Sequence, residues 1–159
     1  MTETTANTYD QQAAPTDWEI KAAERSRREA ELFDLNKTAL FDALAAADVT
    51  EVAVNFDGYG DEGQIESVEA RICAVVVAMP EGAVAIIELT FDQTEPKHSS
   101  ISIAEAIERM AYDVLYRTCG GWQDGDGAYG DVVFDVEERI ITLDFNERYT
   151  ASNNYTYTF

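Results

Sequence analysis

Two segments of the chain place apolar residues at helical spacing. In the first, over residues 16–47, they fall in the second half: Phe33, Leu40, Phe41 and Leu44. Residues 17–31 are mostly charged. Thr16 and Glu19 have the spacing of an N-terminal capping box. We therefore expect one long helix over 16–47 that packs through its second half and projects its first half into solvent.

The second helical segment follows Ser102, which has the same capping spacing to Glu105. Its apolar residues form one stripe: Ile103, Ala106, Ile107, Met110, Val114 and Leu115. Gly120 and Gly121 are typical of a helix end. We expect a helix from residue 103 to these glycines.

Alternation with a period of two predicts strands elsewhere. Residues 51–57 alternate apolar and polar positions, with Val52, Val54 and Phe56 on one side. We expect a second strand over about 65–78 that returns as 83–91 in a hairpin, after a Pro-Glu-Gly turn. Residues 92–100, which include the only histidine, His98, are expected to form a loop.

The most regular alternation lies between residues 131 and 146. Its apolar members are Val132, Phe134, Val136, Ile141, Leu143 and Phe145. A two-residue turn at Glu138-Arg139 would pair Val136 with Ile141 and place both apolar sets on one face. The opposite face then collects Asp131, Asp135 and Asp144.

The predicted order is α-β-β-β-α-β-β, which indicates one α+β domain over residues 16–159 with a mainly antiparallel sheet and helices packed on one face. A chain of 159 residues buries enough surface to fold without a metal or a disulfide. Residues 1–15 are polar and are expected to form a disordered tail. They lack the pattern of a signal peptide, and no window holds the roughly 20 apolar residues of a membrane helix. We expect a cytoplasmic protein.

The net charge of the chain is more informative about its partners than any motif. The chain has 31 acidic and 11 basic side chains, a net charge of −20. Such a charge repels nucleic acid and anionic membranes and attracts basic proteins, so we expect neither direct nucleic-acid binding nor membrane binding. The excess is uneven: residues 48–70 contain seven acids and no Lys or Arg, and residues 119–159 contain eight acids against Arg139 and Arg148.

The residues that usually carry catalysis or bind metals are sparse. His98 adjoins two serines without the glycines of a nucleophile elbow. Cys73 and Cys119 with one histidine do not make a zinc ligand set, and we expect two buried free thiols. We therefore expect no enzyme activity, catalytic residue, metal or cofactor.

Residues 124–131 superficially resemble a calcium-binding loop. They place Ala128 and Tyr129 where such a loop needs a ligand and a glycine. We favour a plain turn, and a weak cation site stays open as the alternative.

The acids themselves form the candidate binding surface. Its members are Glu51, Asp57, Asp61, Glu62, Glu66, Glu69, Asp124, Asp126, Asp131, Asp135 and Asp144. Outward residues i and i+2 of a strand lie about 6.6 Å apart, and a duplex strand carries one phosphate per roughly 3.4 Å of axis. These carboxylates could approximate phosphate rows and occupy a nucleic-acid channel. The alternative is that the acidity serves only solubility.

Tyr155, Tyr157 and Phe159 alternate with small polar residues over 153–159. We favour an edge strand that packs on the core. A docking strand added to a partner sheet is the second interpretation.

Five segments carry a resemblance to a known family: Phe56–Glu66, Ala106–Tyr112, Gly120–Trp122, Asp126–Gly130 and Asn146–Tyr149. Through them the chain, from about residue 50 to 159, resembles an uncharacterised bacterial family of small acidic proteins, a domain of unknown function. The resemblance transfers no catalytic residue. Members of the family are similar to proteins encoded on plasmids and other mobile elements, so the resemblance implies a counter-defence role.

We thus expect an acidic inhibitor that blocks the Lys/Arg-lined nucleic-acid path of a basic protein or nucleoprotein complex. A defence nuclease or CRISPR effector would be the partner, and the inhibitor would be of the anti-CRISPR or anti-restriction type. Two alternatives stay open. A carboxylate-based enzyme would enclose two carboxylates in a pocket, and a plain structural interaction module would bind through residues 155–159 or 17–31.

Overall fold

The computed structural model describes residues 14, 16–59, 62–89 and 95–159. In chain order the elements are α1 (Asp17–Ala46), β1 (Glu51–Tyr59), β2 (Glu62–Ile72), β3 (Val75–Val77), β4 (Ala83–Glu88), β5 (Lys97–Ser102), α2 (Ile103–Thr118), β6 (Ala128–Asp135) and β7 (Ile140–Glu147). The predicted α+β class is confirmed. β3 and β5 are additional to the predicted order. No described helix is long and apolar enough to cross a membrane.

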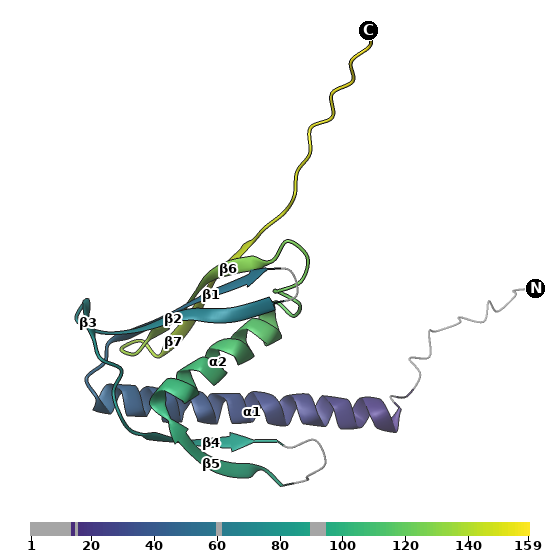
Figure 1. Ribbon diagram of the computed structural model, residues 1–159. Coiled ribbons are helices and arrows are strands. Elements are labelled where there is room, and N and C mark those ends of the chain that lie inside the picture. Colours follow the sequence, from purple (N-terminus) through teal and green to yellow (C-terminus); the bar gives the residue numbers. More distant parts are fainter. Residues whose placement is uncertain (1–13, 15, 60–61, 90–94) are drawn as a thin grey trace, which may run out of the picture.

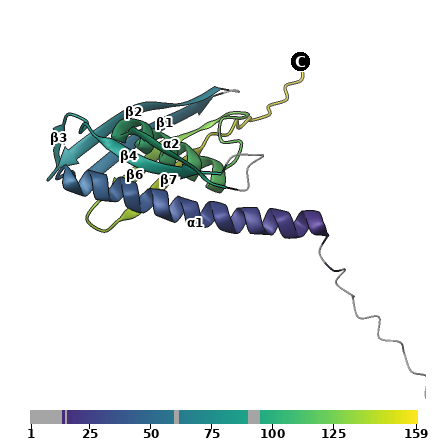
Figure 2. The ribbon, with the colours of Figure 1, turned by 90° about the horizontal axis from the view of Figure 1, so that it is seen from below.

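All strand pairs are antiparallel and form two sheets. The larger sheet has the order β3-β2-β1-β6-β7, and β4 pairs with β5 in the smaller one. Both helices lie on one side of the larger sheet (Figures 1 and 2), and β4 packs against α1 and α2. We call the helix-covered side of the larger sheet its inner face and the other side its outer face.

Helix α1 begins as its sequence predicts. The Thr16 hydroxyl accepts a hydrogen bond from the Glu19 backbone N–H at 3.2 Å, and the Glu19 carboxylate accepts one from the Thr16 N–H at 2.7 Å. The buried residues of α1 are Leu40, Phe41 and Leu44. Its first half is exposed and extends beyond the sheets (Figure 2), as expected.

The inner face of the sheet forms the core together with α2. Val52, Val54 and Phe56 of β1 and Val132 and Phe134 of β6 are all 0% exposed. Each such side chain contributes about 1.5–3 kcal/mol by leaving water. Alternation along two adjacent strands therefore fixes which face of the sheet is covered.

The predicted hairpin of 65–78 with 83–91 is wrong. Strand β2 turns back at Cys73 and Ala74, whose φ angles are +48° and +69°, and pairs with the short strand β3. Strand β4 pairs instead with β5, so His98 lies in a strand and not in a loop. Cys73 is exposed in its turn, which corrects its expected burial, and Cys119 is partly buried. Both thiols are free.

The last hairpin has the predicted faces but another register. Ile141 pairs with Phe134 and not with Val136, because the connection has four residues, 136–139, instead of two. Arg139 takes a φ of +55° there, and the Asp135 carboxylate accepts a hydrogen bond from the Glu138 N–H at 3.0 Å. A slip of two residues preserves the faces because side chains alternate with a period of two.

Residues 148–159 form no helix or strand and lead away from the end of the sheet (Figure 1). Tyr155 is 70% exposed and Tyr157 is 74% exposed. The expectation that 153–159 packs on the core as an edge strand is therefore wrong.

Candidate functional site

The outer face of the larger sheet gathers most of the predicted acidic residues. Six of them are placed there by strand register: Glu51, Asp57, Glu69, Asp131, Asp135 and Asp144. We call these six the acidic face. Strands β1 and β6 are neighbours, so the two acid-rich segments of the sequence, 48–70 and 119–159, lie side by side.

The other five predicted acids are placed differently. Glu66 is exposed at the irregularity where β2 shifts register against β1. Glu62 begins β2, but its side chain lies outside the described part of the structure, as does Asp61. Asp124 and Asp126 lie in the turn before β6, at the same end of the sheet as Asp57, because Gly58 pairs with Ala128 there.

Like charges oppose each other twice on the acidic face. Glu51 is the direct cross-strand partner of Asp135, and Asp131 is the direct partner of Asp144. Directly opposed residues have Cβ atoms about 4.5–5.5 Å apart, and like charges in that position destabilise a sheet. The alternation of the sequence predicts the shared face, but only the observed register produces these opposed pairs.

Positive side chains compensate one part of the face and leave the other. The Arg71 guanidinium lies 2.9 Å from Glu69 and 3.7 Å from Glu51. Asp131 accepts a hydrogen bond from the Asn55 amide at 3.1 Å. Within the described ranges, no Lys, Arg or His lies within ion-pair distance of Asp131, Asp135 or Asp144. Negative charge therefore concentrates over β6 and β7.

The outer face is shallowly hollowed. An open depression of about 370 Å³ crosses β2, β1 and β6, and Glu51, Glu69 and Asp131 are among its lining residues. A second depression of about 380 Å³ is lined by Glu51 and Asp135, among others. These hollows are open to solvent and do not enclose a small molecule.

One end of the sheet is held by a cluster around Arg148. Its guanidinium donates to the Asp57 carboxylate at 2.9 Å and to the Gly58 carbonyl at 3.1 Å, and lies 4.5 Å from the centre of the Tyr129 ring. The Arg148 backbone N–H donates to the Gly127 carbonyl at 2.9 Å. We call these five residues the Arg148 cluster. In the sequence, Arg148 is one of two cations in an acidic segment and part of the Asn146–Tyr149 segment that carries the family resemblance, but neither feature predicts its contacts with Asp57 and Gly58.

Glycines make room for an indole beside this cluster. A Cβ atom on Gly58 or Gly63 would lie 2.6 Å from the Trp122 ring. Trp122 is 4% exposed and packs edge-on against Phe56, with 5.3 Å between the two ring centres. Nearby, the Tyr112 hydroxyl of α2 accepts a hydrogen bond from the Ile65 N–H at 3.0 Å. The five segments that carried the family resemblance thus meet at this end of the molecule.

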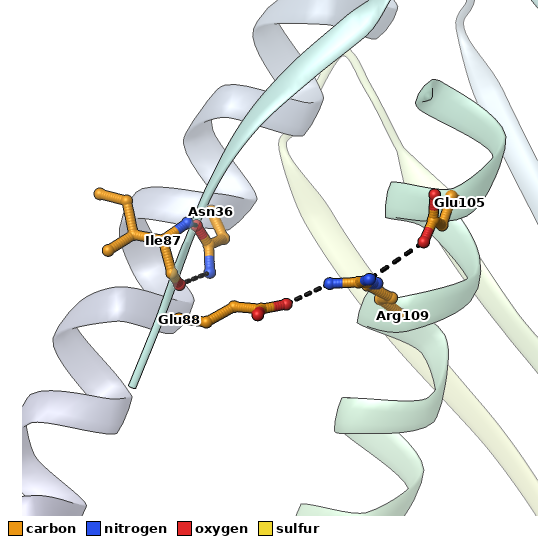
Figure 3. Close-up of polar contacts among 5 residues, drawn as sticks. All are labelled: Asn36, Ile87, Glu88, Glu105 and Arg109. Atoms are coloured by element: carbon orange, nitrogen blue, oxygen red, sulfur yellow. Dashed lines mark hydrogen bonds and ion pairs between the residues drawn. The ribbon is translucent and has the colours of Figure 1, made fainter. Parts of the chain in front are cut away.

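An open groove of about 460 Å³ runs between α1, α2 and β4. There the Asn36 amide donates to the Ile87 carbonyl at 2.9 Å and accepts from the Ile87 N–H at 2.8 Å, while Arg109 bridges Glu88 and Glu105 (Figure 3). These contacts attach the smaller sheet to the helices. Arg117, the other basic residue of the groove, pairs with Asp113 at 3.0 Å, so both arginines are engaged with partners inside the molecule.

The structure does not bring the other candidate residues, those of the 124–131 segment and His98, together into one site. Residues 124–127 form a turn in which Gly125 and Gly127 have φ angles of +64° and +81°, and residues 128–131 begin β6. Across the described ranges, no group of three or more His, Cys, Asp or Glu side chains is placed to hold a metal ion. His98 is exposed on β5, at the far side of the helices from the acidic face.

The fold and its surface define a class: an α+β protein whose antiparallel sheet is covered by helices on one face and carries opposed carboxylates on the other. The profile of one family matches residues 32–159 of the chain, and the chain belongs to it; it is a family of unknown function (DUF6878). No curated protein and no solved structure matches the chain. The family match leaves out residues 17–31, the exposed first half of α1.

Proposed function

We propose that the acidic face binds a basic partner protein. The observations that carry this proposal are two pairs of opposed like charges, Glu51 with Asp135 and Asp131 with Asp144, on a sheet face that neither of the described helices covers (Figure 1). Folding alone favours opposite or neutral partners in such positions, because each like-charged pair costs stability. A partner that supplies Lys and Arg side chains turns the same repulsion into binding energy.

In its more specific form, the face replaces nucleic acid in the partner's binding path. Asp131 and Asp135 lie four residues apart on the outer side of β6, which is about 13 Å along the strand and close to four phosphate rises of about 3.4 Å each. The net charge of −20 would also speed association with a basic cleft by long-range attraction. The resemblance to proteins of plasmids and mobile elements supports a defence nuclease or a CRISPR or restriction complex as the partner.

The proposal requires a steep dependence on salt. Immobilised protein is to be exposed to host lysate and to purified defence nucleases, at about 50 mM and about 200 mM salt, the range over which phosphate-like contacts weaken strongly. Retention of a nuclease at low salt and its release at high salt is the expected result. The retained nuclease must then release a labelled duplex when free protein is added. A salt-insensitive partner, or one that keeps its duplex, would refute the mimic.

Variants of the acidic residues, tested for turnover and for retention of the partner, separate the two other functions that the sequence leaves open. A carboxylate enzyme would show turnover that is lost when two acids are replaced, with partner binding intact. A plain interaction module would retain its partner after Asp131, Asp135 and Asp144 are neutralised. The acidic-face proposal predicts that this neutralisation removes retention.

A further inference from the structure

Residues 153–159 have the composition of a strand but pair with no strand in the described part of the structure. Tyr155, Tyr157 and Phe159 recur every second residue and are 70%, 74% and 114% exposed. Tyr, Thr and Phe are favoured in strands, because their side chains pack well on a pleated surface. No charged residue occurs from Tyr149 to Phe159, in a chain whose net charge is −20. This segment is therefore unlike the acidic face, and a charged partner is not what it fits.

The larger sheet has a free edge with a matching pattern. Among the described strands, β7 is the last in the order, and its one described partner is β6. Its inward residues Ile141, Leu143 and Phe145 are only partly buried, whereas Val132 and Phe134 on β6 are 0% exposed. The core is thus incomplete along β7. Three apolar residues at a spacing of two are also what residues 153–159 offer.

Contacts at the start of the segment direct it away from its own β7 edge. The Arg148 N–H donates to the Gly127 carbonyl at 2.9 Å, and the Thr150 hydroxyl donates to the Asp126 carboxylate at 2.7 Å. Both contacts lie on the β6 side of β7, opposite to the free edge. Beyond them the chain continues outward from the end of the sheet (Figure 1).

We propose that residues 153–159 of one copy add as a strand to the free edge of β7 in a second copy. Exchange in both directions gives a two-fold dimer, in which the same pair of surfaces is used twice. Tyr155, Tyr157 and Phe159 then lie beside the inward residues of β7 and complete the partly covered core. The added backbone hydrogen bonds also remove an open sheet edge, which is otherwise prone to unspecific pairing.

The dimer and the acidic face respond to salt in opposite directions. Two chains of charge −20 repel each other, and salt screens that repulsion. Dimerisation should therefore strengthen with salt, while binding of a basic partner weakens. The strand exchange does not depend on the proposed function of the acidic face, and either one can fail without the other.

Sedimentation equilibrium of the full chain tests the exchange. The expected mass is twice that of the 17.6 kDa chain. The variant Tyr155→Ser/Tyr157→Ser/Phe159→Ser should sediment at the single-chain mass and keep its circular dichroism, because these side chains are exposed in one copy. The matched control Thr156→Ser/Thr158→Ser changes the alternate positions of the same segment and should remain a dimer.

Amide hydrogen exchange locates the contact. The amides of β7, residues 140–147, should exchange more slowly in the dimer than in the triple serine variant. A single-chain mass for the unaltered protein at low and high salt would overturn the proposal, and so would a triple variant that still dimerises. A dimer in which β7 exchange does not differ from that of the triple variant would refute the assigned edge.

Discussion

The same strands build both faces of the five-stranded sheet, but the inner face stabilises the fold and the outer face carries charges that repel each other. On β1 and β6, the inward Val54 and Val132 are neighbours and are both 0% exposed. On the same two strands, the outward Glu51 and Asp135 are neighbours and repel each other. Stability is thus concentrated on one face. That concentration leaves the other face able to carry charge that folding does not favour.

The largest expected effect on stability comes from truncating a buried side chain on the inner face. Phe134 is 0% exposed, and the centre of its ring lies 6.2 Å from the centre of the Phe41 ring. Phe134→Ala should lower the free energy of unfolding by about 3–5 kcal/mol, through lost burial and the cavity that remains. Val133→Ala, on the outer face of the same strand, should cost about 1 kcal/mol or less. Urea denaturation of both variants measures the contrast, and equal losses would contradict it.

A smaller loss is expected at the end of the sheet, where the strands approach closely. A Cβ atom on Gly127 would lie 1.8 Å from the Gly58 carbonyl oxygen, and the φ of Gly127 is +81°. Gly127→Ala should destabilise by roughly 2–4 kcal/mol, from backbone strain and the forced shift together.

Gly125→Ala is the matched control for this variant. Gly125 has a φ of +64°, and nothing lies within 4 Å of its added Cβ. Only the backbone strain remains, about 1–2 kcal/mol. If urea midpoints show both variants equally destabilised, the close approach of Gly127 to Gly58 is not what requires the glycine.

Removing the Arg148 side chain should have a more modest effect. Its ion pair with Asp57 is partly exposed, with side chains 35% and 44% accessible, so solvent screening limits its worth. With the Gly58 hydrogen bond and the Tyr129 ring contact, Arg148→Ala should cost about 1 kcal/mol. Arg148→Lys keeps the charge and should recover only part of this. A double-mutant cycle with Asp57→Asn measures the ion-pair share, which should vanish at high salt.

The smallest effect has the opposite sign and belongs to the outer face. Asp131 and Asp144 oppose each other directly, so Asp144→Asn should raise the free energy of unfolding by about 0.2–1 kcal/mol at low salt. The gain should shrink as salt screens the repulsion. Denaturant titrations at two salt concentrations test this. A stability that falls in the variant would mean that the opposed pair does not repel.

The local features of this fold could be predicted from the sequence. The caps at Thr16 and Ser102 and the alternation of β1 and β6 depend on residues within a few positions of each other, and the structure confirms them. The shared outward face of Asp131, Asp135 and Asp144 followed from the same alternation. It was correct despite the wrong register, because an error of two residues keeps every side chain on its face.

Pairing between distant segments could not be predicted in the same way. Cys73 and Ala74 turn the chain with positive φ angles and without a glycine, so the sequence gives no turn signal there. The strand partner of β4 was consequently misassigned. The adjacency of the acid-rich segments depends on β1 pairing with β6, and the hydrogen bonds of Arg148 depend on contacts about 90 positions apart.

We propose that the position of the carboxylates, and not the total charge, determines whether the acidic face binds its partner. Two variants that lose three negative charges each can separate these causes. Asp131→Asn/Asp135→Asn/Asp144→Asn changes the acidic face and keeps the side-chain acceptors for Asn55 and Glu138. Glu31→Gln/Glu81→Gln/Glu108→Gln removes exposed acids from other parts of the molecule.

The most direct measurement is the concentration of each variant that releases half of a labelled duplex from the retained nuclease. The acidic-face variant should require at least about tenfold more protein than the unaltered chain, because contacts between opposite charges at an interface are lost. The control should stay within about twofold, since distant exposed charges are largely screened. Equal losses in both variants, or no loss in either, would show that the position of the carboxylates on the acidic face does not determine binding.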